Sequence, residues 1–251
     1  RSAVTNHRGQ FVANLVRAMN QYGFDGLDLD WESDIDWDLF IAFARDLRQA
    51  APNAILTLPG GALNGNYETV DPRIVTLLQY IDQFNLMSYY PMTAYAGAGW
   101  LSWHNSPLGG AKPTTPVSIE DSFNRYVQAG VPKTKLGMGI SFYAICYTGG
   151  VTGPNQGTDN GVTIQGGDNE YPLSDLFGPQ GAYVEAYRAW DATASATYLS
   201  LPQPERHSCR YVSFEDEQSI LAKGQYSRQG GYGGVIVWTI NQGHVASHSQ
   251  P

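Results

Sequence analysis

The chain has 251 residues, 42% of them hydrophobic, which is enough to bury the core of one α/β barrel or of one ordinary domain with an insertion. Its formal net charge is -8 and its few Lys and Arg residues form no basic run, which argues against nucleic acid as a partner. No uninterrupted apolar stretch reaches about 18 residues, so the sequence predicts no membrane span.

Helical and strand patterns alternate along most of the chain. Phe11, Leu15, Ala18 and Met19 recur at helical spacing before Gly23, which is typical of a helix that ends in a tight turn. The predicted elements, in chain order, are a helix over residues 8–22, a strand over 24–32, a helix over 35–49, a strand over 54–58, a helix over 70–80, a strand over 81–89, a helix over 118–130, a strand over 136–143, a helix over 215–229 and a strand over 234–240. This order indicates a parallel sheet built from right-handed βαβ units.

Residues 144–210 interrupt the alternation with sequence rich in Gly, Asn and Thr. Asp159-Asn160-Gly161 predicts a hairpin turn, and the later part, with Tyr183, Val184, Tyr187 and Trp190, looks helical. The Gly-rich run lacks the Gly-Lys-Ser/Thr ending of a phosphate loop. We therefore expect a partial (β/α) barrel domain over residues 1–143 and 211–251, with an inserted α+β subdomain over residues 144–210.

Cys146 and Cys209 flank this irregular segment. Two cysteines are too few for a disulfide scaffold, and their spacing does not suit zinc. They could form a clasp across the neck of the insertion, or they could be two unrelated buried thiols, which a cytosolic location would favour.

The segment from Asp25 to Glu32 carries the strongest chemical signal. On a strand, Asp28, Asp30 and Glu32 project to one side about 7 Å apart and repel one another, so at least one should hold a proton near neutral pH when they are shielded from water. Glu32, the outermost of the three, is best placed to act as a general acid on a ligand at the carboxyl end of the strand.

Two other interpretations of these acids remain open. A half-exposed strand could carry them as a solvated face, although strands of a parallel sheet are normally apolar on both faces. Acids at this spacing could also bind calcium or magnesium, but apolar residues flank them rather than the oxygen-rich turns that such ions prefer. We therefore expect no metal and no cofactor.

The motif Asp25-Gly26-x-Asp28-x-Asp30-x-Glu32 resembles the DGxDxDxE signature of family 18 glycoside hydrolases, the chitinases and their relatives. Further matches follow in the order of that family and extend over nearly the whole chain: Met87-Ser88-Tyr89 resembles its Met-x-Tyr strand, Phe142-Tyr143 the end of its Phe-Tyr strand, and Val237-Trp238 its last strand. The resemblance implies a TIM (β/α)8 barrel with an inserted α+β subdomain before the last helix-strand unit.

The resemblance also implies an endo-acting, retaining hydrolysis of β-1,4 bonds between N-acetylglucosamine units, in which the substrate's own acetamido group is the nucleophile. Glu32 would protonate the leaving oxygen, Asp30 would orient the acetamido group, Asp28 would share a proton with Asp30, and Tyr89 would hydrogen-bond the acetamido oxygen. Chitin or its oligomers would be the partner of a secreted, monomeric protein.

Five further residues are candidates for sugar binding. Trp238 would form the floor of the sugar site and Met87 and Tyr143 its wall, although Met87 and Trp238 could equally be core residues. Trp100 and Trp103 lie in the long loop after the Met-x-Tyr strand, where they are either platforms for the leaving group or ordinary loop anchors.

The sequence departs from the family pattern in three ways. Tyr90 stands where many members have Asp, and Ala144-Ile145-Cys146-Tyr147 replaces a common Gly-Arg-x-Trp. The acid strand, the fourth of the family's barrel, comes after only 23 residues, so the first three strands and a closing helix are expected to be absent from this chain. We expect a fragment of a longer protein rather than strands supplied by another chain.

Two other functions remain open. An endo-β-N-acetylglucosaminidase acting on N-glycan cores shares the acid motif, although Trp238 and the insertion favour a chitinase. A chitinase-like lectin keeps the barrel but lacks the catalytic acid, and the presence of Glu32 argues against it.

Overall fold

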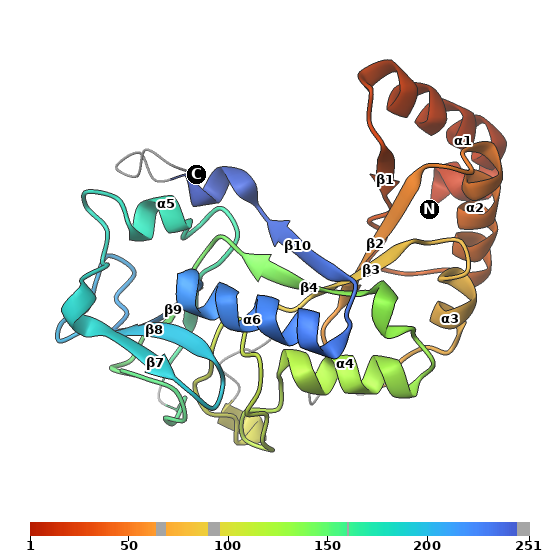
Figure 1. The fold of residues 1–251 in the computed structure, drawn as a ribbon. Helices are drawn as coiled ribbons and strands as arrows, with labels where there is room; N and C mark the ends of the chain where they lie inside the picture. The colour runs from red at the N-terminus through yellow and green to blue at the C-terminus, as the bar shows by residue number, and fades with distance from the viewer. Residues whose placement is uncertain (64–68, 90–95, 160, 245–251) are drawn as a thin grey trace.

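The computed structural model describes residues 1–63, 69–89, 96–159 and 161–244 (Figure 1). Its first sheet contains five strands, all parallel, in the order β1-β2-β3-β4-β10. Their bounds are β1 Gly26–Asp28, β2 Ile55–Gly61, β3 Gln83–Met87, β4 Leu136–Ser141 and β10 Gly234–Trp238. The sheet is curled, and helices pack along one side of it and follow the curl.

The helices beside this sheet are α1 Ser2–Tyr22, α2 Trp37–Ala50, α3 Arg73–Leu77, α4 Ile119–Gln128 and α6 Glu217–Gly230. Local chemistry fixes where several of them begin and end. Asp36 and Ser118 cap α2 and α4 by accepting backbone N–H groups, and Gly23 ends α1 in the left-handed region at φ 71°. Their apolar faces join the strands in one core, which includes Phe40, Leu47, Leu56, Leu86 and Met138. No helix within the described residues is both long and apolar enough to cross a bilayer.

The acid-bearing strand is shorter than predicted. β1 covers only Gly26–Asp28, and its pairing with β2 ends with the bond from the Leu29 N–H to the Thr57 carbonyl oxygen. The Trp31 N–H then bonds the Leu29 carbonyl oxygen at 3.1 Å, which turns the chain out of the sheet. The prediction of a single strand over residues 24–32 is therefore wrong beyond Asp28.

Glycine is needed in β1 because the neighbouring strand lies very close. A Cβ atom at Gly26 would lie 1.8 Å from the carbonyl oxygen of Ile55. No other residue fits this position without moving one of the two strands. The single fixed glycine of the acid motif thus sets the distance between β1 and β2.

The second sheet is antiparallel in the described pairings and has the order β6-β5-β9-β8-β7. Its strands are β5 Ile145–Tyr147, β6 Ile164–Gly166, β7 Arg188–Asp191, β8 Ala196–Ser200 and β9 Tyr211–Phe214, with the short helix α5 Leu173–Leu176 beside them. β9 belongs to this sheet, although the predicted boundary at residue 210 places it with the barrel. Asn160, in the predicted hairpin turn, lies outside the described residues.

The helix suggested around Tyr183 to Trp190 is wrong. Glu185–Tyr187 form a single 3-10 turn, and Trp190 lies in β7, opposite Thr197 of β8. The Asp191 carboxylate accepts the N–H groups of Thr193 and Ala194 and so closes a hairpin turn. Pairing with β8 therefore overrides the local helical pattern.

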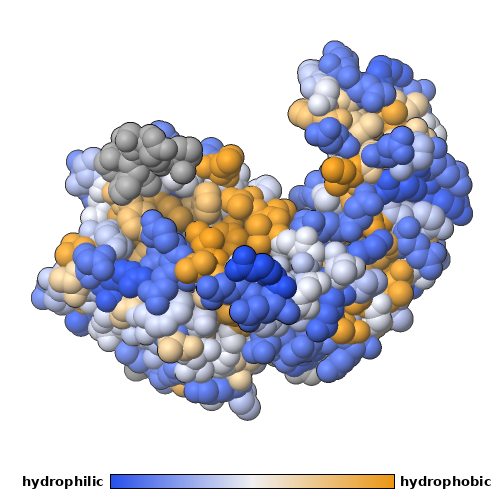
Figure 2. Space-filling model, in the orientation of Figure 1, coloured by the Kyte–Doolittle hydropathy of each residue, from blue (hydrophilic) through white to orange (hydrophobic). Residues whose placement is uncertain are grey.

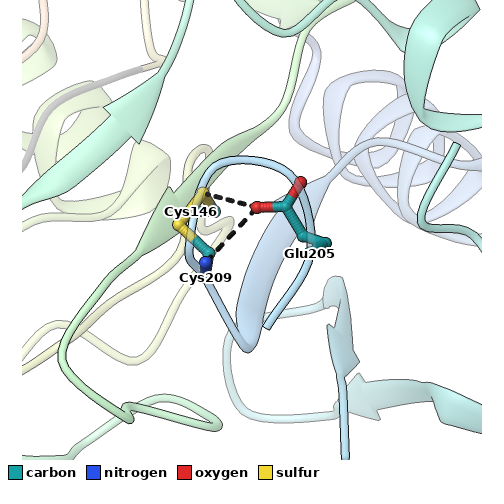
Figure 3. Close-up of side chains that lie close together, drawn as sticks. All are labelled: Cys146, Glu205 and Cys209. Carbon is teal, nitrogen blue, oxygen red and sulfur yellow. Dashed lines mark hydrogen bonds between the residues drawn. A yellow bond between two sulfur atoms is a disulfide. The ribbon is translucent and has the colours of Figure 1, made fainter. Parts of the chain in front are cut away.

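A disulfide joins Cys146 of β5 to Cys209, which comes just before β9 (Figure 3). The two Cα atoms are 5.7 Å apart, and the bridge spans 63 residues of sequence. Glu205 lies against it, and its carboxylate accepts the backbone N–H groups of His207 and Cys209. The structure thus contains the clasp predicted as one of two alternatives. In the loop-entropy description, closing a loop of this length stabilises the fold by about 4 kcal/mol.

Within the described residues, the parallel sheet has open edges, in contrast to a closed barrel. There β10 pairs only with β4, and its Val235, Val237 and Trp238 are 47%, 38% and 41% exposed. On the adjacent helix α6, Leu221 is 59% exposed. Figure 2 shows the apolar surface that gathers around β10.

Candidate active site

The three acids of the motif lie where β1 ends and the chain leaves the sheet. Asp28 is the last residue of β1, and Asp30 and Glu32 follow outside regular structure. The Thr57 hydroxyl of β2 donates a hydrogen bond to the Asp28 carboxylate. All three acidic residues are largely exposed, so this part of the fold shields their carboxyl groups from water only in part.

The acids nevertheless influence one another. A hydrogen bond with Asp30 raises the pKa of Glu32, and desolvation and the charge of Asp30 add to this effect. Desolvation raises the pKa of Asp28, the hydrogen bond from Thr57 opposes it, and the charge of Asp30 adds to the rise. A carboxyl group whose pKa is raised toward neutral is better suited to donate a proton.

Tyr89 follows β3 and lies within the electrostatic field of the acids. Burial raises its pKa, and the charges of Glu32, Asp168, Asp30 and Asp28 raise it further. The hydroxyl therefore stays protonated and can donate a hydrogen bond. Its ring packs edge-on against Tyr143, with the ring centres 5.8 Å apart.

Sequence reasoning missed Asp168, an exposed residue of the segment between β6 and α5. Gln242, which follows β10 and is 3% exposed, donates from Nε2 to Asp168 Oδ1 at 2.5 Å and accepts the Asn169 N–H at 3.2 Å. This pair of bonds holds the segment against the carboxyl end of the parallel sheet. No sequence signal could have found Asp168, because its partner lies 74 residues away.

The remaining predicted site residues lie in different surroundings. Met87 is the half-buried last residue of β3, Trp238 is the exposed last residue of β10, and Tyr143 is only 2% exposed. Tyr143 lies just beyond β4, so these three residues come from the carboxyl ends of β3, β4 and β10, the edge that also carries the acids at β1. Tyr90, which replaces the usual Asp, lies outside the described residues.

Comparison with known sequences places the chain in a family. Residues 1–243 match the sequence model described as Glycosyl hydrolases family 18. The chain belongs to this family. Chitotriosidase-1 of Mus musculus is 26% identical over 275 residues, which cover 95% of this chain and 54% of that protein. The family 18 chain spans about half the length of the curated relatives it matches, or less.

Solved structures extend the likeness to the fold. Chitinase ChiW from a Paenibacillus strain superposes with a TM-score of 0.74 at 25% identity, over 96% of this chain and 29% of that one. A family 18 N-acetylglucosaminidase from Paenibacillus barengoltzii gives a TM-score of 0.73 at 24% identity, over 96% of this chain and 74% of that one. The curled parallel sheet of this family 18 chain is thus TIM-barrel-like.

Trp100 and Trp103 lie in the protein interior in this family 18 chain. They are 6% and 1% exposed, and the Trp103 Nε1–H donates to the Val117 carbonyl oxygen at 3.0 Å. A ring needs an exposed face to stack on a sugar. The structure therefore favours the alternative that both residues anchor the loop, and the interpretation of the buried pair as platforms is not supported.

Potential metal ligands converge elsewhere in the described part of the chain. Single ligand atoms of Cys146, Glu205 and Cys209 lie within 4.8 Å of one another (Figure 3). Because the two sulfur atoms are bonded to each other, neither is available as a thiolate while the bridge is intact.

Proposed function

We propose that this chain carries the catalytic acid of an endo-acting chitinase, which hydrolyses β-1,4 bonds between N-acetylglucosamine units. The observation that carries the proposal is the raised pKa of Glu32 in its hydrogen bond with Asp30, at the sheet edge that also presents Tyr89. Membership of family 18 supports the same substrate class.

In this mechanism the Glu32 carboxyl proton passes to the glycosidic oxygen as the bond to the anomeric carbon breaks. The acetamido oxygen of the same sugar forms the new bond to that carbon and gives an oxazolinium ion. Water then attacks the anomeric carbon, the bond from the acetamido oxygen to that carbon breaks, and the water gives a proton to the Glu32 carboxylate. Two successive inversions retain the configuration. Asp30 orients the acetamido group, Asp28 shares its proton with Asp30, and Tyr89 donates to the acetamido oxygen.

Trp238 is proposed as the floor of the sugar site, because its exposed ring stands at the carboxyl end of β10. Met87 would shape the wall, and Tyr143, which is 2% exposed, would support the wall through its contact with the ring of Tyr89. We also propose that further strands of a longer parent chain close the sheet at its open edges and shield the acids. The complete protein would then act as a secreted monomer without a cofactor, and its disulfide is in keeping with an oxidising compartment.

The experiment compares hydrolysis of chitin oligomers by this chain, by Glu32→Gln and by the longer parent. Glu32→Gln should lower kcat by roughly 10²–10⁴-fold. Glu217→Gln, the same change at an exposed position in the first turn of α6, should leave kcat unchanged. Because the acid must be protonated, activity should be lost as pH rises through the pKa of Glu32, which its hydrogen bond with Asp30 raises from the ordinary value.

The other outcomes distinguish the alternatives. Undiminished turnover by Glu32→Gln would remove that residue from the mechanism. Release of N-glycans from glycoproteins, without cleavage of chitin oligomers, would favour an endo-β-N-acetylglucosaminidase. Binding of oligomers without turnover by both this chain and its parent would favour a lectin.

A further inference from the structure

Three consecutive polar residues lie deep in the protein beside the proposed site. His104, Asn105 and Ser106 are 0%, 1% and 3% exposed. Burial of three polar side chains in a row costs free energy unless each one is hydrogen-bonded. Their hydrogen-bond partners therefore indicate what this segment does. Two of those partners lie at the carboxyl ends of β3 and β4.

Ser106 holds the residue that precedes Tyr89. Its Oγ–H donates to the Ser88 carbonyl oxygen at 2.6 Å. The Ser88 hydroxyl in turn donates to the Gly139 carbonyl oxygen at 3.2 Å and accepts the Gly139 N–H at 2.9 Å. The backbone leading to Tyr89 is thus fixed from the loop on one side and from β4 on the other.

Lys223 of α6 determines the direction of the Ser106 bond. Its Nζ lies 3.0 Å from Ser106 Oγ, and the lysine side chain is fully buried. An ammonium or amine hydrogen donates here, because the single hydroxyl hydrogen of Ser106 is already given to Ser88. The hydroxyl therefore cannot rotate away without losing one of its two partners.

Glu215 completes this network. It is 3% exposed and forms an ion pair with Lys223, and its other oxygen accepts the Ser219 hydroxyl at 2.6 Å. A buried ion pair adds little stability compared with apolar residues of similar size. Here the ion pair orients the Lys223 amino group toward Ser106.

Asn105 holds the second strand end. Its Nδ2 donates to the Tyr143 carbonyl oxygen at 3.1 Å and to the Ser141 hydroxyl at 2.8 Å. Its backbone N–H donates to the Ser213 hydroxyl of β9 at 2.9 Å. One short segment therefore fixes the backbone beside Tyr89 and the backbone of Tyr143, whose rings pack against each other.

We propose that Asn105 and Ser106 are positioning residues, which fix the carboxyl ends of β3 and β4 and thereby hold the Tyr89 hydroxyl in place beside the acids. The effect of this positioning on catalysis rests on the proposed function. Lys223 and Glu215 belong to the same device, because they keep the Ser106 hydroxyl directed at Ser88.

The kinetic test uses Ser106→Ala, which removes the bond to Ser88 and leaves the Lys223–Glu215 pair. In the hydrolysis of chitin oligomers, kcat of this variant should be roughly tenfold lower than that of the unaltered protein, and KM should stay within about twofold. The reason is that a misplaced catalytic group affects the transition state most. Tyr89→Phe should also lower kcat, and adding Ser106→Ala to it should cost nothing more. Additive losses in the double variant would overturn the proposal.

The matched control is Ser102→Ala. Ser102 is also fully buried in this loop, and its hydroxyl donates to the Gly153 carbonyl oxygen at 2.7 Å, away from β3. Ser102→Ala should lower the free energy of unfolding about as much as Ser106→Ala does, and it should leave kcat unchanged. If Ser106→Ala does not fold, Ser106→Cys, which has a similar shape and a weak donor, replaces it with the same expected pattern.

A second measurement does not require turnover. Fluorotyrosine incorporated at position 89 should give a ¹⁹F resonance that shifts or broadens in Ser106→Ala and not in Ser102→Ala. An unchanged resonance, or equal changes in both variants, would overturn the positioning role. If neither the unaltered chain nor the longer parent hydrolyses the oligomers but this pattern is seen, the proposed function fails while the positioning of Tyr89 stands.

Discussion

Strands β9 and β10 are both apolar, but they differ in what surrounds them. All four residues of β9 are buried, whereas none of the five residues of β10 is. β9 pairs with β5 on one side and β8 on the other, and the disulfide precedes it. In the part of the chain that the structure describes, β10 pairs with β4 alone.

The difference shows that apolar sequence does not by itself determine burial. A strand becomes buried when neighbours cover both its edges and its faces. The antiparallel sheet obtains those neighbours from within the described chain, whereas the parallel sheet leaves an apolar edge beside its carboxyl-end residues. Equal substitutions in the two regions should therefore have unequal costs in the free energy of unfolding.

The largest expected difference comes from a pair of leucines. Leu199 of β8 is fully buried, and Leu199→Ala should lower the free energy of unfolding by about 2–5 kcal/mol. Leu221 of α6 is 59% exposed, and Leu221→Ala should change it by less than about 0.5 kcal/mol. Urea denaturation of both variants measures the two costs.

The same pair can sharpen the comparison in a longer parent protein. If further strands cover the open edge there, Leu221→Ala should cost more in the parent than in this chain. Equal, large costs for both leucines in this chain would mean that α6 is not exposed as the structure has it.

The contrast also explains what the sequence could predict. Alternating helices and strands, and the two ends of the disulfide, leave periodic or chemical signals in neighbouring residues. The place where β1 ends leaves none, because Asp30 and Glu32 continue the period-two pattern after the chain has turned away from β2. Local pattern likewise misassigned Trp190, whose strand exists only because β8 pairs with it.

For the candidate site, the sequence predicted the acids and Tyr89 but not the residues that hold the neighbouring backbone in place. The motif residues are recognisable by type and spacing. The partners of Ser88 and Asp168 are remote in sequence: Ser106 from a loop, and Gln242 from the segment after β10. Such contacts depend on tertiary packing, which single-sequence patterns do not encode.

A pH titration of stability gives the next largest effect, within the antiparallel region. Burial lowers the pKa of His104, whose Nε2 lies 3.1 Å from Asp191 and whose Nδ1 lies 2.9 Å from the Tyr211 hydroxyl. A lowered folded pKa means that the unfolded state binds the proton first. Stability should therefore fall as pH drops below about 6.5, with a slope of at most about 1.4 kcal/mol per pH unit from this residue, until the folded pKa is reached.

Unfolding of His104→Gln across pH 4–8 measures this contribution. The variant should be less stable than the unaltered protein at pH 8. Between about pH 6.5 and 5 its free energy of unfolding should fall less steeply, since glutamine does not titrate. Identical pH profiles for the variant and the unaltered protein would show that His104 is not the group responsible.

The smallest expected change in stability lies at the open edge, where Val235→Lys places a charge on β10. Val235 is 47% exposed, so the free energy of unfolding should change by less than about 0.5 kcal/mol. An unpaired apolar edge favours association with another chain, and lysine on such an edge opposes it.

Sedimentation velocity at increasing concentration should show that this isolated chain self-associates and that Val235→Lys does so less. Gln49→Lys, which adds the same charge at an exposed position of α2, should leave association unchanged. Equal reduction by both substitutions would attribute the effect to net charge and would break the contrast between the covered and the open sheet.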